Sequence, residues 1–110
     1  MLIPEFVMGI SDYFDIPGKG IVLIGQISKG TVRIDDHIEL MNEEGLFTGN
    51  ATVIGIERMN EKLDYATEND AIGLVIKGVS KETCHLSKIV VRRNIENINE
   101  TFAIILDIPY

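Results

Sequence analysis

The sequence is poor in cysteine, and it has no tryptophan and no long apolar run. Its single cysteine, Cys84, has no second cysteine with which to form an internal disulfide, which is typical of a reducing compartment. The longest apolar runs, 21–24 and 102–106, are much shorter than the ~20 residues that span a bilayer. The first residues also lack the basic and apolar regions of a secretory signal. We therefore expect a cytoplasmic protein that does not enter a membrane.

Cations are also scarce, with 10 lysine and arginine residues against 17 aspartate and glutamate residues and a net charge of -7. This charge opposes broad binding to nucleic acid or anionic lipid, because each phosphate contact needs a cation. Residues 77–93 nevertheless hold 5 of the cations and 1 acidic residue. Solvated charge is the simplest interpretation of this basic strip, and contact with RNA or a partner is the alternative. The basic strip consists of Lys77, Lys81, Lys88, Arg92 and Arg93.

The length of 110 residues, with 45% hydrophobic and 25% charged residues, indicates one globular domain. Its apolar residues alternate with a period of two over many short segments, which is typical of strands and leaves little room for helix. In 21–27 one face carries Ile21, Leu23, Gly25 and Ile27, and in 71–76 one face carries Ile72, Leu74 and Ile76. The predicted strands are 6–10, 21–27, 37–41, 47–59, 71–76 and 89–92. Short strands joined by glycine-bearing turns predict an all-β closed barrel or a sandwich.

Glycine and proline mark the turns between these segments. Pro17, Gly18 and Gly20 predict a turn after the first strand, and Gly30 predicts a turn after the second. Gly49 and Gly55 lie within the long segment 47–59, so we expect bulges or sharp curvature there. Residues 80–83 begin with serine and predict a weak helical turn.

Catalytic and cofactor motifs are not met. The glycine spacing of 25–30 suggests a phosphate-binding loop, but Thr31 stands where that loop requires lysine. Cys84 and His85 could give a metal two ligands, whereas zinc sites need three or four. Neighbouring residues in an extended segment point to opposite faces, which also argues against a Cys/His nucleophile pair. We therefore expect no enzymatic activity, no cofactor and no metal.

The order of four segments is informative. Residues 14–22 (FDIPGKGIV), 25–36 (GQISKGTVRIDD), 52–57 (TVIGIE) and 71–79 (AIGLVIKGV) follow one another at characteristic distances. In these segments residues 6–93 resemble the second domain, a β-barrel, of elongation factor Tu and related translational GTPases. The resemblance implies a small closed antiparallel β-barrel of the translation-factor type over residues 1–93, with about six strands. An additional C-terminal strand would follow the barrel.

The resemblance also implies limits on function. In the family a GTP-binding domain precedes this barrel, whereas five residues precede Phe6 here, so we expect no nucleotide binding. The barrel of elongation factor Tu helps to hold the aminoacylated end of tRNA with an acidic residue and an Arg-Gly pair. Thr83 and 86–87 occupy those positions, so we expect this activity to be absent. Asp35 and Glu68 replace common glycines of the family, and we expect Asp35 and Asn69 to adopt the left-handed backbone.

Residues 94–110 extend beyond the resemblance. The segment 94–100 is polar, and 101–108 places its apolar residues in phase, at Phe102, Ile104, Leu106 and Ile108. An apolar strand of this kind must be covered. We expect it to pack on the chain's own barrel in a monomer, and exchange with a second copy in a dimer is the alternative.

Three functions remain open at this point. The first is a non-catalytic binding module that contacts a protein or ribosomal partner through one face of the barrel. The second is an RNA-contacting module that uses the basic strip from Lys77 to Arg93. The third is an accessory barrel that works with a separate chain carrying a GTPase.

Overall fold

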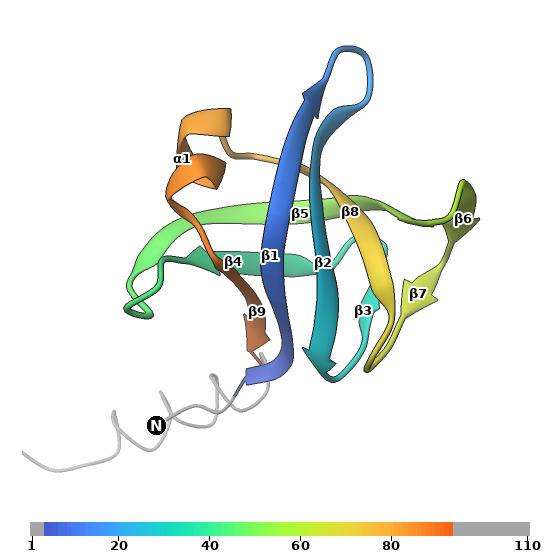
Figure 1. Ribbon diagram of the computed structural model, residues 1–110, viewed down its shortest axis with the longest axis horizontal. Helices are drawn as coiled ribbons and strands as arrows, with labels where there is room; N and C mark the ends of the chain where they lie inside the picture. Colours follow the sequence, from blue (N-terminus) through green and yellow to red (C-terminus); the bar gives the residue numbers. More distant parts are fainter. Residues whose placement is uncertain (1–3, 94–110) are drawn as a thin grey trace, which may run out of the picture.

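Six antiparallel strands form a closed β-barrel in the computed structural model, which describes residues 4–93 (Figure 1). Around the barrel the strands follow the order β4, β9, β1, β2, β8 and β5, and β5 pairs again with β4. The short β6 pairs with β5 outside this ring, and β3 pairs with β7. The elements are β1 (Pro4–Ile16), β2 (Gly20–Lys29), β3 (Val32–Arg33), β4 (His37–Met41), β5 (Phe47–Arg58), β6 (Glu61–Leu63), β7 (Tyr65–Ala66), β8 (Ala71–Lys77), α1 (Lys81–Leu86) and β9 (Ile89–Arg93).

The closed antiparallel barrel confirms the predicted all-β class, and the sandwich alternative is wrong. The strand that is bonded to the ring from outside is β6, which pairs with the end of β5 across the Met59–Asn60 turn. The predicted link 94–100 and strand 101–108, with the choice between the chain's own barrel and a second copy, lie outside the described residues.

The barrel core is built from the faces that the alternation predicted. Ile21, Leu23 and Ile27 of β2 are buried, as are Ile72, Leu74 and Ile76 of β8. These residues pack with Phe6 and Met8 of β1 and with buried side chains of the remaining barrel strands. α1 begins at the N-cap Ser80, whose side chain accepts a hydrogen bond from the Thr83 backbone N–H, and it contributes the buried Cys84 to the core. A single continuous core therefore holds all the strands of the ring.

The first strand extends beyond its predicted end at residue 10. β1 pairs with β2 as far as Ile16, and Ser11 lies at a register shift in this ladder. A turn with Pro17 and Gly18 at its centre then reverses the chain, because the Ile16 carbonyl accepts from the Lys19 N–H at 3.0 Å and Gly18 has a positive φ. Prediction failed here because the polar Asp12 and Asp15 interrupt the apolar pattern, although pairing with the apolar β2 keeps the segment extended. The resulting hairpin projects beyond the rest of the barrel (Figure 1).

Irregular backbone occurs where turn and bulge chemistry indicated it, and at one further place. β5 has a register shift between Val53 and Gly55, which leaves Ile54 as the extra residue, and its ladder with β4 also shifts beside Gly49. Asp35 and Asn69 both have positive φ, as predicted. The left-handed pair 59–60, at the turn between β5 and β6, was not predicted, and its first residue is a methionine.

Candidate functional site

The basic strip is divided by the fold into paired and unpaired cations. Arg92 lies over the Phe6 ring, and its Nη1 donates to Asp36 Oδ2 at 2.7 Å and to the Thr31 carbonyl. Its guanidinium also lies 3.7 Å from a carboxylate oxygen of Glu5. Arg92 therefore joins β9 to the segment around β3 and is only partly exposed.

Arg93 is also held by a carboxylate. Both Nε and Nη2 donate to the two carboxylate oxygens of Glu39, with 2.6 Å between Nε and Oε1. The hydrogen bond to Glu39 raises the pKa of Arg93, and the negative charge of that carboxylate adds to the effect while burial opposes it. Arg93 thus links β9 with the neighbouring β4.

The three lysines of the strip remain exposed and lie on different elements: Lys77 ends β8, Lys81 begins α1, and Lys88 precedes β9. None of the ion pairs described for residues 4–93 involves these lysines. Lys77 and Lys81 line one hollow, which Asp15 and Glu82 share. The five cations therefore do not form one continuous free surface.

A groove runs along the outside of β8. Ala71 and Gly73 place small residues on this outer face, and residues directly opposite in a ladder share a face. Gly73 pairs with Ile24 of β2 on one side and with Glu57 of β5 on the other. The small residues of β8 therefore lie between taller neighbours and form the floor of the groove.

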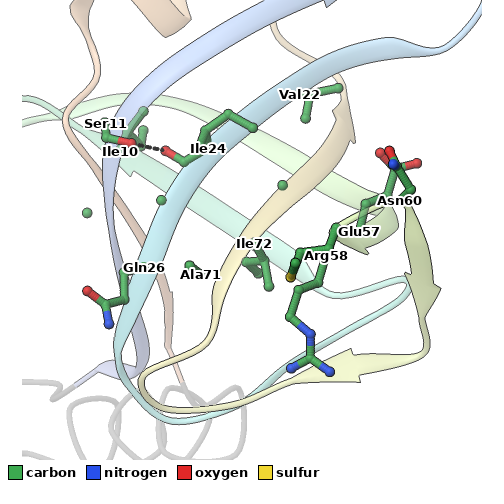
Figure 2. Close-up of a pocket in the computed structure, with 14 residues that line it drawn as sticks. Ile10, Ser11, Val22, Ile24, Gln26, Glu57, Arg58, Asn60, Ala71 and Ile72 are labelled. Carbon is green, nitrogen blue, oxygen red and sulfur yellow. Dashed lines mark hydrogen bonds between the residues drawn. The ribbon is translucent and has the colours of Figure 1, made fainter.

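The walls of this groove come from two sides of the barrel (Figure 2). On the β2 side lie Val22, Ile24 and Gln26, and Ser11 of β1 donates to the Ile24 carbonyl at 3.1 Å. On the β5 side lie Glu57 and Arg58, followed by the turn residues Met59 and Asn60. The hollow has a volume of about 830 Å³. We call it the β8 groove, and its lining residues are Gly9, Ile10, Ser11, Val22, Ile24, Gly25, Gln26, Glu57, Arg58, Met59, Asn60, Ala71, Ile72 and Gly73.

Gly73 keeps the floor of the β8 groove low. A Cβ atom at this position would lie 3.0 Å from Val22 Cγ1 and 3.3 Å from Ile24 Cδ1, both closer than ordinary contacts. Without it, the side chains of Val22 and Ile24 lie across the small β8 residue. The apolar side chains of Val22 and Ile24 thus lie directly beside Gly73 at the floor of the β8 groove.

The rim of the β8 groove carries an unusual methionine. Met59 is 94% exposed and has a φ of 50°, a left-handed conformation that costs free energy for a residue other than glycine or asparagine. Its neighbour Asn60 shares that conformation and suits it better. The turn thus exposes a flexible apolar side chain, a residue type common on adaptable binding surfaces.

Apolar side chains continue from the β8 groove toward the projecting hairpin. Phe14 pairs with Val22, and Val22 pairs with Val75, so the three side chains share the outer face. Phe14 is 50% exposed, and Ile16 and Ile54 are also exposed. The salt bridge from Lys19 to Glu57, with 2.7 Å between Nζ and Oε1, lies beside this surface. The outside of the barrel therefore exposes apolar side chains of β1 and β5, whereas Val22 of β2 and Val75 of β8 between them are buried.

Among residues 4–93 no group of three or more His, Cys, Asp and Glu residues is placed to hold a metal ion. Cys84 is buried in the core, and its pKa is raised first by burial and then by the negative charge of Asp15, so its reactive thiolate form is disfavoured. Within the same part of the chain no helix has the length and apolar character needed to cross a bilayer.

No protein-family model matches the chain. The sequence did not predict the β8 groove. The available signal was the pair of small residues Ala71 and Gly73 at alternate positions of an otherwise apolar strand.

Proposed function

We propose that this protein is a non-catalytic binding module, of the kind represented by the second barrel of elongation factor Tu, and that it contacts a partner protein, free or on the ribosome, through the β8 groove. The apolar outer face around this groove is the observation that carries the proposal. The outward-facing Val22, Ile24 and Val75 do not belong to the inner core cluster. Val22 and Val75 are nevertheless buried, whereas Ile24 is partly exposed. An apolar surface rimmed by polar groups is typical of an interaction site.

A protein suits this surface better than RNA does. Phosphate recognition needs accessible cations, but Arg58, which lines the groove, and Lys19, which pairs with the lining residue Glu57, both have carboxylate partners. Two further arginines, Arg92 and Arg93, are held by Asp36 and Glu39. Apolar side chains of a partner would instead replace water on Ile24 and Met59, at roughly 25 cal/mol for each Å² of apolar surface buried.

The test is site-specific photo-crosslinking in the cells that make the protein. A photoreactive amino acid would replace Met59 on the rim, and in a matched protein it would replace Leu46, which is also exposed but lies in the β4–β5 turn. We expect position 59 to capture one discrete protein that position 46 does not capture. Ile24→Lys in the wall should abolish this crosslink, whereas Leu46→Lys should leave it unchanged.

Two results would overturn the proposal. The first is equal capture from positions 59 and 46, which would indicate random collision. The second is a crosslink at position 59 that Ile24→Lys does not reduce, although circular dichroism shows that the variant is folded.

A further inference from the structure

We propose that one edge of β1, from Asp12 to Ile16, binds an extended basic segment of the partner protein as an added β-strand. We call this side of the strand the β1 edge. The inference rests on the proposed function, because the occupant is the partner protein, and it adds the mode of binding and the chemistry of the partner.

The backbone of the β1 edge is open. β1 pairs with β9 from Pro4 to Gly9, and the Ile10 N–H then donates to the Lys88 carbonyl, after which α1 replaces β9. From Asp12 to Ile16 the described pairing of β1 is with β2 alone. Backbone groups of alternate residues point to opposite sides of a strand, so those of Tyr13 and Asp15 point away from β2. Of these groups, the two carbonyls and the Asp15 N–H have no hydrogen-bond partner described within residues 4–93, and the Tyr13 side chain contacts His85 of α1.

In the free protein, local side chains shield the β1 edge and no other strand described for residues 4–93 pairs with it. The Tyr13 N–H donates to the Asp12 side chain at 2.8 Å rather than to another strand. Asp12 and Asp15 are both exposed, and edge strands commonly carry charges that prevent indiscriminate pairing. The edge is therefore unpaired and kept from sheet aggregation by its own carboxylates.

The same carboxylates select the partner. None of the ion pairs described for residues 4–93 involves Asp12 or Asp15. Asp12 shares the outer face with Phe14, and Asp15 lies on the opposite face with Tyr13. A strand with lysine or arginine three residues apart would therefore place one cation beside each carboxylate, whereas antiparallel pairing of two copies would bring like charges together. Charge complementarity thus favours a basic partner over a second copy of this chain.

The apolar side chains beside the edge supply contacts of the right spacing. Phe14 and Ile16 lie two residues apart and are exposed by 50% and 39%. Phe14 shares its face with Val22, a wall of the β8 groove. A strand that follows the β1 edge can therefore place its own alternate apolar side chains on this face, close to the proposed binding surface.

The probe is a short synthetic peptide with lysines three residues apart, to lie opposite Asp12 and Asp15, and with valines opposite Phe14 and Ile16. It is titrated into the full chain and followed by amide resonances and hydrogen exchange. One control peptide carries glutamate in place of lysine. A second control keeps the lysines but is methylated on alternate backbone nitrogens, which removes the N–H groups that would donate to the Tyr13 and Asp15 carbonyls. We expect the first peptide to slow exchange of the Asp15 amide about tenfold or more, and neither control to do so.

A matched variant tests the charge. Asp12→Asn with Asp15→Asn keeps the shape of both side chains, and Asp12→Asn retains an acceptor for the Tyr13 N–H. We expect it to bind the lysine peptide about tenfold more weakly, at the upper end of the effect of exposed ion pairs. The control is Glu43→Gln with Glu44→Gln, which removes the same charge from the β4–β5 turn. If this control weakens binding of the lysine peptide to the same extent, the inference is overturned.

The inference also fails if the methylated peptide binds as well as the first peptide, because binding would then be general charge attraction. It fails separately from the proposed function. Loss of the Met59 crosslink on Ile24→Lys, together with an unprotected Asp15 amide, would leave the β8 groove as the binding site and remove the β1 edge. Peptide binding at the β1 edge without a specific crosslink at position 59 would instead support the β1 edge and remove the β8 groove as the binding site.

Discussion

Two glycines of this barrel share a left-handed backbone but differ in the space that surrounds them. Gly30 and Gly45 both have positive φ, at 75° and 80°. A Cβ on Gly30 would lie 1.8 Å from the Glu5 carbonyl oxygen, whereas a Cβ on Gly45 would meet nothing within 4 Å. The two glycines therefore separate the cost of a left-handed backbone from the cost of a steric clash.

We expect Gly45→Ala to lower the free energy of unfolding by about 1 to 2 kcal/mol, the usual penalty for a left-handed alanine. Gly30→Ala should lower it by about 4 kcal/mol or more, because β1 must also move away. Urea unfolding followed by circular dichroism measures both values. Similar losses for the two variants would show that β1 is not packed against Gly30.

Cys84 gives the molecule an alkaline sensitivity. Burial, and to a lesser extent Asp15, raises the pKa of this thiol above its ordinary value of 9.0. Above that value the unfolded chain loses the thiol proton while the folded protein keeps it, so unfolding becomes more favourable as pH rises. The corresponding stability is complete below pH 9.0 and is lost as the pH rises through the pKa of the folded protein.

The measurement is the free energy of unfolding at neutral pH and at several pH values above 9.0, for the native chain and for Cys84→Ala. We expect the difference in stability between the two proteins to change with pH in favour of the variant. Parallel pH profiles would contradict a raised thiol pKa.

At the scale of elements, the contacts of β9 hold the barrel closed at its last described strand. Arg92 reaches Asp36 at 2.7 Å with both side chains largely covered, whereas Arg58 reaches Asp70 at 3.4 Å with its side chain 43% exposed. We expect Arg92→Ala to cost about 2 to 3 kcal/mol, because the charged hydrogen bonds are lost and Asp36 keeps its charge. Arg58→Ala should cost about 0.5 kcal/mol or less.

Urea unfolding again distinguishes the two arginines. If Arg92→Ala lowers the free energy of unfolding as little as Arg58→Ala does, the contacts of Arg92 do not stabilise the connection from β9 to the segment around β3. Arg92 would then be a candidate for contact with a ligand, as the sequence had suggested.

Some elements of the structure could be predicted from the sequence, and others could not. The strands around Leu23 and Leu74 were predictable because alternation of apolar residues reports directly on a half-buried strand. The left-handed Asp35 and Asn69 were predictable from turn chemistry. By contrast, the β8 groove depends on which residues oppose Gly73, and this cross-strand register is set by the whole sheet rather than by any local pattern.

The whole molecule is acidic, and the pairing of its arginines bears on the RNA alternative. Lys77, Lys81 and Lys88 are the cations of the basic strip that the described ion pairs leave unpaired within residues 4–93. We therefore expect no saturable RNA binding at an ionic strength of about 0.15 M, because few counterions would be released. Fluorescence anisotropy with a labelled single-stranded RNA measures this.

Micromolar binding that weakens on Lys77→Ala with Lys81→Ala, and whose salt dependence falls at the same time, would establish the RNA alternative instead. Lys29→Ala with Lys62→Ala is the matched control, because it removes the same charge from outside the basic strip.

Closure of the barrel by its first and last described strands has a kinetic consequence. β9 pairs with β1, so that Phe6 lies opposite Arg92, and the ends of the described chain must meet before the ring is complete. Contacts so distant in sequence carry a large loop-closure entropy and are typical of domains that fold in milliseconds to seconds rather than microseconds. During synthesis the nascent chain cannot complete this ring until Ile89–Arg93 has left the ribosome. Until then β1 and β4 each lack their β9 neighbour, which leaves two strand edges open to non-native pairing.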